Sequence, residues 1–197
     1  MCLLIETIRI ADKQLENIPL HELRMNSSRR ELFGANEDID LHKAINIPEN
    51  ISEGIYKCRV MYGMQIKEIS IEPYVFKKIN TIKIIRDNAI EYSHKYTDRN
   101  RFQQLLSEAG SDEILIVKNN YITDTSFSNV IFFDGITWYT PALPLLNGTM
   151  REYLLNRKII FEKNILLNDL HQYKILRIIN AMNTFEDQRD FEIQLIK

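Results

Sequence analysis

The sequence has few of the residues that build disulfide-bonded, fibrous or flexible proteins. Its 197 residues include only two cysteines, six glycines and five prolines. Cys2 and Cys58 are too few for a disulfide scaffold and form no CxxC pair, so we expect two buried or idle thiols. The low glycine and proline content excludes a collagen-like chain and a low-complexity linker.

An excess of positive charge and a long apolar run are also missing. Lys and Arg number 25 against 27 Asp and Glu, which argues against a general nucleic-acid-binding protein. No stretch approaches the ~20 apolar residues of a membrane span. The apolar start Met1–Ile5 is interrupted by Glu6 and Arg9, unlike a secretory signal. We therefore expect a cytoplasmic protein with neither a membrane nor a nucleic-acid partner.

Common catalytic and metal-binding motifs are absent as well. The chain has no P-loop, GxGxxG, HExxH or GxSxG motif. Its histidines have no mutual metal-ligand spacing, so we expect surface or packing histidines and no metal site; they are His21, His42, His94 and His171. A basic cluster on a predicted helix, Arg24, Arg29 and Arg30, is by itself typical of a solvated helix face.

What the sequence does contain is ample core material, with 45% hydrophobic and 10% aromatic residues. In the first half, Pro19 opens a helical pattern that places Leu20, Leu23 and Ser27 on one face, and Gly34 ends it. The other predicted elements of this half are a strand over 2–10, a short helix within 35–54, and strands of an antiparallel unit over 54–63, 64–73 and 77–86.

The second half begins with a polar connector, 87–98. Asp98 is expected to cap a helix that ends at Gly110, and Asp134-Gly135 to turn a hairpin. The remaining predicted elements are strands over 113–117, 121–123, 129–133, 136–140, 158–165 and 175–179, a helix over 149–155 and a helical turn over 168–173. We expect an α+β fold with a small α/β domain, 1–86, and a larger β-rich domain with helices, 87–197. A cleft at their joint is the expected place for a site.

Three polar segments are candidates for chemistry. Lys95 lies in the connector beside His94, Thr123–Asn129 gathers hydroxyls, an amide and a carboxylate, and Asn147–Arg151 opens a helix with a hydroxyl. A helix start with a hydroxyl is suited to binding phosphate. Taken one by one, by residue type alone, these segments are typical of a surface lysine, an ordinary polar turn and a simple helix cap.

Eight segments, taken in order, resemble the motifs of one family. They are Ile5–Arg9 ("FETIR"), His21–Ser28 ("HLxRLxxS") with Gly34 after it, His94-Lys95 before Arg99, Asp112–Leu115 ("DEALxL"), Ile122–Asn129 ("VTExxxSN"), Trp138–Pro141 ("xxTP"), Leu146–Arg151 ("LxGITR") and Ile179–Met182 ("CNAL"). The chain thus resembles the fold-type-IV pyridoxal-phosphate enzymes, the class IV aminotransferase family, over nearly its whole length. The resemblance implies a two-domain fold like that of D-amino-acid aminotransferase, pyridoxal 5'-phosphate as cofactor and a homodimer.

The resemblance also implies roles for individual residues. Lys95 would bind the cofactor covalently and then move the substrate α-proton, since a lysine amine of lowered pKa serves as nucleophile and base. Arg24 would clamp the cofactor phosphate, and Asp124 would face the pyridine nitrogen. The other implied contacts are Gly148 and Thr149 in the phosphate cup, Ser128 and Asn129 beside the phosphate or ring, and Asn180 and Ala181 near the substrate carboxylate or phosphate.

Two features depart from the family pattern. Asp124 stands where the family usually has glutamate, one methylene longer. The chain begins almost at the "FETIR" strand, so the first strand of the family, which helps to form the substrate pocket, is expected to be missing or very short.

Three functions remain open from the sequence. The first is a lyase of the aminodeoxychorismate type, which forms 4-aminobenzoate and pyruvate on the route to folate. The second is an aminotransferase for D-amino or branched-chain acids, and the third is a non-catalytic relative. The Asn180–Met182 segment and the small size favour the lyase.

Overall fold

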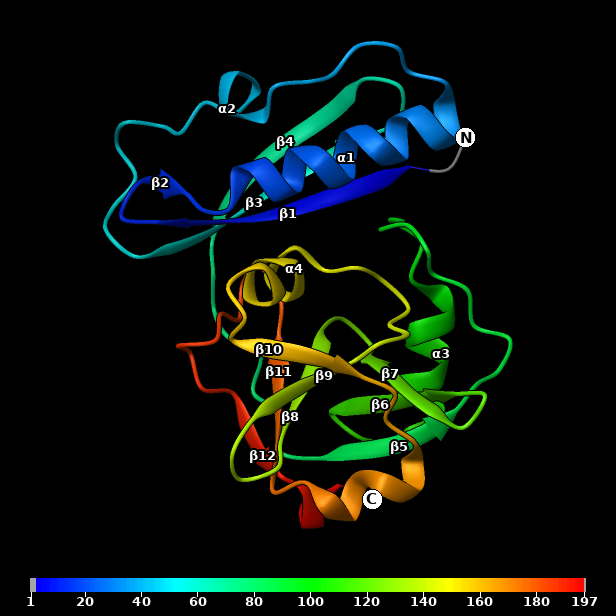
Figure 1. The fold of residues 1–197 in the computed structure, drawn as a ribbon. Helices are drawn as coiled ribbons and strands as arrows, with labels where there is room; N and C mark the ends of the chain where they lie inside the picture. The colour runs from blue at the N-terminus through cyan, green and yellow to red at the C-terminus, as the bar shows by residue number, and fades with distance from the viewer. Residues whose placement is uncertain (1–2, 197) are drawn as a thin grey trace. The chain divides into compact units, whose positions relative to one another are not determined.

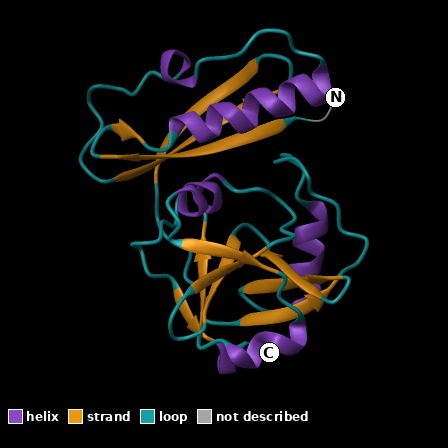
Figure 2. Ribbon diagram, viewed as in Figure 1, coloured by secondary structure: helices purple, strands orange, loops and turns teal. Residues whose placement is uncertain are grey.

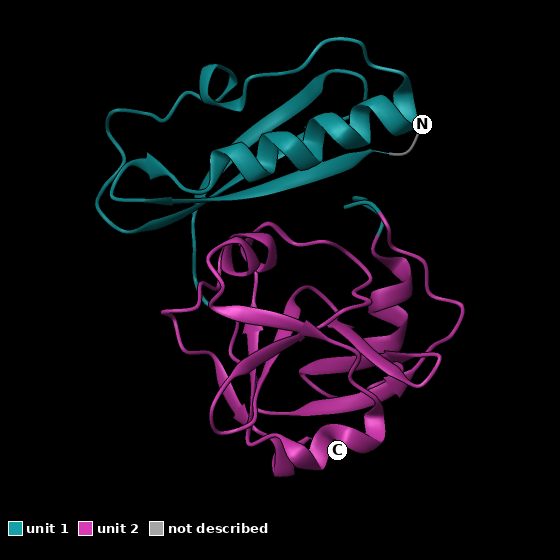
Figure 3. Cartoon of the chain, viewed as in Figure 1, with its two compact units in different colours: residues 1–76, 94–98 teal, residues 77–93, 99–197 magenta. Residues whose placement is uncertain are grey.

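The computed structural model describes residues 3–196, which divide into two compact units (Figures 1 and 3). Unit 1 is Met1–Phe76 with His94–Asp98, and unit 2 is Lys77–Ser93 with Arg99–Lys197. Cys2 lies outside the described residues, and Cys58 is a buried free thiol.

Unit 1 is built on a four-stranded antiparallel sheet in the order β2-β1-β3-β4. Figure 2 shows the strands in orange. The strands are β1 (Leu4–Ala11), β2 (Gln14–Leu15), β3 (Ile55–Tyr62) and β4 (Ile66–Pro73). Side chains of β1 alternate between buried and partly exposed, as expected of a strand with one face in the core. Leu4, Ile8 and Ile10 fill that face, and Glu6 lies among them with no exposure.

The main helix of unit 1, α1 (Ile18–Phe33), packs against this sheet and ends at Gly34, whose φ of 66° is left-handed. A short helix, α2 (Leu41–Ala44), follows. The buried face of α1 includes Ile18, His21, Met25 and Ser28. The predicted face was wrong, because Leu23 is 60% exposed. The face that packs against β1 carries polar groups that find partners inside the unit, so hydrophobicity alone does not identify it.

Unit 2 contains an eight-stranded mixed sheet. Its main path runs β10-β9-β8-β7-β6-β5, and β11 pairs with both β8 and β12. The strands are β5 (Ile82–Arg86), β6 (Glu113–Lys118), β7 (Tyr121–Thr125), β8 (Asn129–Phe133), β9 (Trp138–Pro141), β10 (Ile160–Lys163), β11 (Ile175–Ile179) and β12 (Asp190–Glu192). Neighbouring strands are antiparallel except for the β5/β6 and β9/β10 pairs.

Two α-helices and two short 3-10 helices complete the described part of unit 2: α3 (Asn100–Ala109), α4 (Thr149–Asn156), η1 (Leu167–Gln172) and η2 (Ile193–Leu195). Helix α3 packs on β5 and β6, and α4 packs on β10. The cap of α3 is Arg99 rather than the expected Asp98. The hairpin around Asp134-Gly135 is confirmed, with Phe133 paired to Trp138.

The division of the chain differs from the expected boundary between residues 86 and 87. Strand β5 was expected in the antiparallel unit of the first half, but it pairs in parallel with β6, Ile82 opposite Glu113, and so belongs to unit 2. Lys95 was expected in the larger domain, but its segment hydrogen-bonds to β1 and belongs to unit 1. An isoleucine-rich strand has the same pattern beside either sheet, so the pattern does not identify its partner.

Among the described residues, no helix is both long enough and apolar enough to cross a membrane.

Candidate active site

Lys95 is held by the first strand of unit 1. The Ile5 amide donates to the Lys95 carbonyl at 2.9 Å, and Leu4 forms an isolated antiparallel bridge with Tyr96. Thr97 donates from its amide and its hydroxyl to the carbonyl of Leu3, at 2.9 and 3.1 Å. The segment 95–97 is therefore fixed along the edge of β1, and the Lys95 side chain is half-buried.

The next residue of β1, Glu6, forms a buried polar cluster with two residues of α1. Arg24 donates from Nε to Glu6 Oε1 at 3.0 Å and from Nη2 to Oε2 at 2.5 Å. His21 donates from Nδ1 to Glu6 Oε2 at 2.6 Å. Residues 21 and 24 are one helical turn apart, so both side chains reach the same carboxylate.

The burial and the charges of this cluster determine the protonation states of Glu6 and His21. Burial alone would raise the pKa of Glu6, but the charge of Arg24 and the hydrogen bonds of His21 and Arg24 outweigh it and lower that pKa to about 2. Burial lowers the pKa of His21 more than the Glu6 carboxylate raises it. Glu6 is therefore an acceptor and His21 a neutral imidazole at neutral pH. The His21 proton must lie on Nδ1, which faces the carboxylate.

Neither Glu6 nor His21 was among the predicted site residues. His21 was expected to be a surface or packing histidine, and it is fully buried. The sequence did hold one signal: Glu6 has the same strand parity as Leu4 and Ile8, so a regular β1 must bury it.

The predicted solvated basic face of α1 is wrong for Arg29, which is 2% exposed. Its Nε and Nη2 donate to the Met64 carbonyl at 3.0 and 2.9 Å, and its Nη1 donates to Asn26 Oδ1 at 2.7 Å. Arg29 thus joins α1 to the turn between β3 and β4. Arg24, and not Arg29, donates hydrogen bonds to Glu6.

In unit 2, the predicted site residues Asp124 and Asn129 lie opposite each other on β7 and β8. Asn129 Nδ2 donates to Asp124 Oδ1 at 2.7 Å. The amides of Leu145 and Leu146 donate to Asp124 Oδ2 at 2.8 and 3.0 Å. Burial raises the pKa of Asp124 to about 6, although these hydrogen bonds and the charge of Arg151 oppose the rise.

The start of α4 lies against Asn129 without an intervening side chain. Gly148 is the helix cap and Thr149 the first helical residue. A Cβ added at Gly148 would lie 2.0 Å from Asn129 Oδ1. The φ of Gly148, −75°, is open to any residue, so backbone conformation does not explain the glycine. The close approach of Asn129 does.

Ser128 and Asn180 are also brought together, by the turn after β11. Asn180 Nδ2 donates to Ser128 Oγ at 2.7 Å, and Asn180 Oδ1 accepts from the Met182 and Asn183 amides at 2.7 and 2.9 Å. Ala181 is the residue within this turn whose side chain makes no polar contact. Asn180 thus joins the 180–183 turn to the Ser128 loop.

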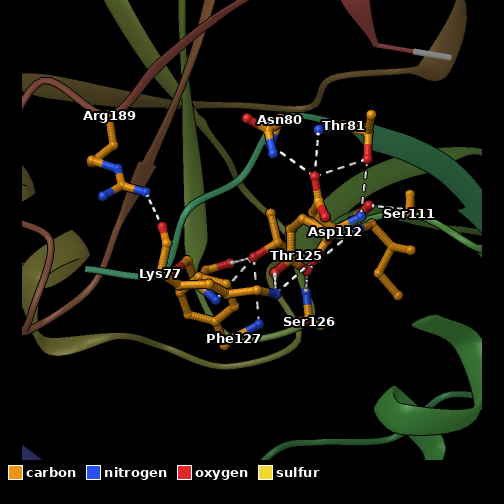
Figure 4. A network of polar contacts seen from close by, with 12 residues as sticks. Lys77, Asn80, Thr81, Ser111, Asp112, Thr125, Ser126, Phe127 and Arg189 are labelled. Carbon is orange, nitrogen blue, oxygen red and sulfur yellow. Dashed lines mark hydrogen bonds and ion pairs between the residues drawn. The ribbon is translucent and has the colours of Figure 1, made fainter. Parts of the chain in front are cut away.

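Asp112, which Figure 4 labels, and the residue after it, Glu113, match the family's "DEALxL" motif. Both hold neighbouring segments of unit 2. Asp112 Oδ2 accepts from the amides of Asn80 and Thr81 at 2.8 and 3.0 Å. Glu113 is fully buried; its Oε1 accepts from the Ser126 amide at 2.9 Å, and its Oε2 lies 3.3 Å from Lys77 Nζ. Glu113 therefore fixes the turn that leads to Ser128 and Asn129, a role the sequence did not predict.

Within residues 3–196, no group of three or more histidine, cysteine, aspartate or glutamate side chains is placed to hold a metal ion.

Comparison with known sequences points in one direction. The sequence model of the amino-transferase class IV family matches residues 92–185. An uncharacterized protein of Haemophilus influenzae (strain Rd) is 38% identical over 183 residues, which cover 91% of this chain and 97% of that protein.

Solved structures agree with this match. A Haemophilus somnus 129PT protein, provisionally named a 4-amino-4-deoxychorismate lyase, superposes with a TM-score of 0.84 and 34% identity, covering 94% of this chain and 98% of the other. A Mesorhizobium loti protein, provisionally named an amino-acid aminotransferase, gives a TM-score of 0.78 at 22% identity over 93% and 97% of the two chains, a likeness of fold. The predicted α+β, two-domain fold is confirmed.

Proposed function

The chain belongs to the class IV aminotransferase family of fold-type-IV pyridoxal-phosphate enzymes, and we propose that it is a lyase of the aminodeoxychorismate type. The reaction splits 4-amino-4-deoxychorismate into 4-aminobenzoate and pyruvate, a step toward folate. The likeness to the Haemophilus somnus protein, at 34% identity over nearly all of both chains, carries this proposal. The Asn180–Met182 segment, which resembles the lyase motif, supports it.

The residues present fit pyridoxal phosphate in their chemistry. Asp124 is a buried carboxylate with a raised pKa, and a cationic ring nitrogen would stabilise its charged form. At Gly148 the backbone that starts α4 is held against Asn129 with no room for a side chain. The N–H groups at the start of such a helix are suited to binding phosphate. When bound, pyridoxal phosphate supplies an electron-withdrawing ring that stabilises negative charge at the substrate α-carbon.

Unit 1 supplies the lysine and the arginine. Lys95 Nζ would hold the cofactor, accept the proton from the substrate α-carbon and deliver it to the departing group, which is released as pyruvate. The backbone bond from Ile5 to Lys95 fixes where this side chain begins. Arg24 would bind the phosphate, and the Glu6 carboxylate fixes the guanidinium by accepting hydrogen bonds from Nε and Nη2.

Unit 2 supplies the remaining contacts. The Thr149 hydroxyl and the first amides of α4 would bind the phosphate, and Asp124 would supply the negative charge for the ring nitrogen. Asn180 orients Ser128 Oγ through its side-chain amide. The residues that we assign to this group are Asp124, Ser128, Asn129, Gly148, Thr149, Asn180 and Ala181.

The first experiment tests cofactor binding. Purified protein mixed with pyridoxal phosphate is expected to develop a visible absorbance band, and Lys95→Ala should abolish it. Lys118→Ala is a matched control, because Lys118 pairs with Glu91 on the surface of unit 2 and should leave the band intact. A wild-type protein without the band would overturn the assignment of the cofactor and favour the non-catalytic relative.

The second experiment separates the lyase from an aminotransferase. We expect 4-aminobenzoate and pyruvate to form from 4-amino-4-deoxychorismate without a keto-acid acceptor. An obligatory requirement for 2-oxoglutarate would instead identify an aminotransferase of D-amino or branched-chain acids. We also propose a cytoplasmic homodimer, and light scattering of the eluted protein tests its mass.

A further inference from the structure

Both oxygens of the Asp124 carboxylate accept hydrogen bonds from protein donors. One oxygen takes two consecutive backbone amides, Leu145 and Leu146, and the other takes the Asn129 side chain. Asp124 is itself 5% exposed, so these bonds form away from water. Charge-assisted bonds to a carboxylate are stronger than neutral ones. The loop that precedes α4 is therefore attached to the end of β7.

Asn129 attaches the same loop a second time. Its Nδ2 donates to the Leu146 carbonyl at 2.8 Å as well as to Asp124. Its Oδ1 lies 2.0 Å from the position that a Gly148 Cβ would take. Asp124 and Asn129 thus hold the Leu145 amide and the amide and carbonyl of Leu146. Asn129 also limits how close residue 148, which precedes Thr149, can come.

We propose that Asp124 is a positioning residue for the phosphate-binding start of α4, holding the Leu145–Gly148 loop directly and through Asn129. This inference rests on the proposed function, which assigns Thr149 and the α4 amides to phosphate. It goes beyond the charge that Asp124 offers to the ring nitrogen, because it makes the same carboxylate necessary for binding at the phosphate end.

Asparagine at position 124 breaks this network in every orientation. If its oxygen keeps the two loop amides, its Nδ2 faces Asn129 Nδ2, and two donors meet. If Asn129 turns over to accept that bond, its oxygen faces the Leu146 carbonyl, and two acceptors meet. Asp124→Asn is therefore isosteric but cannot restore all the bonds.

The matched control is Asp112→Asn. Asp112 also receives two consecutive amides on one oxygen, those of Asn80 and Thr81, in the same unit. A third bond to the same oxygen comes from the Thr81 hydroxyl and not from the 145–148 loop, so an amide oxygen can take the place of Oδ2. The pair of variants thus compares the same substitution with and without the link to α4.

The experiment measures the dissociation constants of pyridoxal phosphate and of pyridoxal, which lacks the phosphate, by absorbance titration. A role at the ring nitrogen weakens both ligands by one factor, so their ratio reports the phosphate end alone. We expect Asp124→Asn to reduce the preference for pyridoxal phosphate over pyridoxal roughly tenfold, the size of one charged hydrogen bond, and Asp112→Asn to leave it unchanged. An unchanged preference in Asp124→Asn would overturn the proposal.

Hydrogen exchange on the protein without cofactor provides the second measurement. The Leu145 and Leu146 amides should be protected in the wild type and in Asp112→Asn, and should exchange faster in Asp124→Asn. Equal protection in all three proteins would also overturn the proposal. Failure of the wild type to bind pyridoxal phosphate would overturn the proposed function instead, and the exchange result would still decide whether Asp124 holds the loop.

Discussion

Glu6 and Arg24 form a bidentate ion pair in the interior of unit 1, with Arg24 Nε 3.0 Å from Oε1 and Nη2 2.5 Å from Oε2. Glu6 is fully buried, and the Arg24 side chain is 16% exposed. Since the backbone of the preceding residue, Ile5, holds Lys95, two consecutive residues of β1 position both proposed cofactor-binding groups of unit 1.

Glu6→Gln is expected to destabilise the protein by about 2–3 kcal/mol, because it leaves Arg24 without a charged partner in a largely buried position. Urea unfolding measures the change. The matched control is Asp38→Asn, which removes the partner of Arg30 from an exposed ion pair and should have little effect. Equal stability of the two variants would contradict a structural role for the Glu6 pair.

The loss of unfolding free energy in Glu6→Gln should become smaller at acid pH. The pKa of Glu6 falls from its ordinary 4.5 to about 2 in the folded protein. A lowered acid pKa contributes stability that is present above pH 4.5 and is lost as the pH falls toward 2. The difference between wild type and Glu6→Gln should therefore be constant from pH 5 to 7 and shrink below pH 4.5.

Asp124 should show the opposite dependence. Its pKa rises from 3.8 to about 6 on folding without cofactor. A raised acid pKa contributes stability that is fully present below pH 3.8 and is lost as the pH rises through 6. Between pH 3.8 and 7, the free energy of unfolding of the wild type should fall by about 2–3 kcal/mol relative to that of Asp124→Asn. Unfolding of both proteins across this range checks the slope, and parallel curves would contradict it.

Gly148→Ala should disrupt the start of α4. The new Cβ would lie 2.0 Å from Asn129 Oδ1 and 3.2 Å from its Cγ, so Asn129 must move and release Asp124 and Leu146. We expect weaker binding of pyridoxal phosphate, measured by titration. Gly110→Ala is the control: its φ of +58° makes alanine strained, about 1 kcal/mol, but nothing lies within 4 Å. It should lower stability and leave cofactor affinity unchanged.

The sequence predicted the elements of this fold better than their partners. Strong local signals, such as Asp134-Gly135 in the hairpin and Gly34 after α1, act within a few residues and were confirmed. The pairing of β5 with β6 and the attachment of Lys95 to β1 are contacts between distant segments. Local propensity does not encode these contacts, so the domain boundary was displaced.

The candidate site shows the same division. The motifs pointed to Asp124 and Asn129, which do lie together on paired strands. The motifs contain Glu6, His21 and Glu113 but did not indicate their roles, because a buried polar or charged residue is taken for a surface residue until its partner is known. Only the alternation of β1 marked Glu6 as inward-facing. The sequence showed that Asp124 replaces the family's glutamate, but not which groups it binds. The structure shows that it accepts the Leu145 and Leu146 amides, which no sequence pattern identifies.

That departure gives the most discriminating prediction. If residue 124 served only as a charge for the ring nitrogen, Asp124→Glu, which installs the family's usual residue, should bind pyridoxal phosphate as well as the wild type or better. The added methylene instead moves the carboxylate ~1.5 Å farther from β7, while Asn129 and the Leu145–Leu146 loop are spaced for aspartate. We expect weaker binding and faster exchange of the Leu145 and Leu146 amides, because the longer side chain must bend or displace the loop.

The control is Asp134→Glu, at an aspartate that accepts the Ile136 and Thr137 amides in the exposed hairpin turn, and it should leave cofactor affinity unchanged. An Asp124→Glu protein that binds the cofactor more tightly than wild type would show that the charge, and not the reach of the side chain, is what residue 124 contributes.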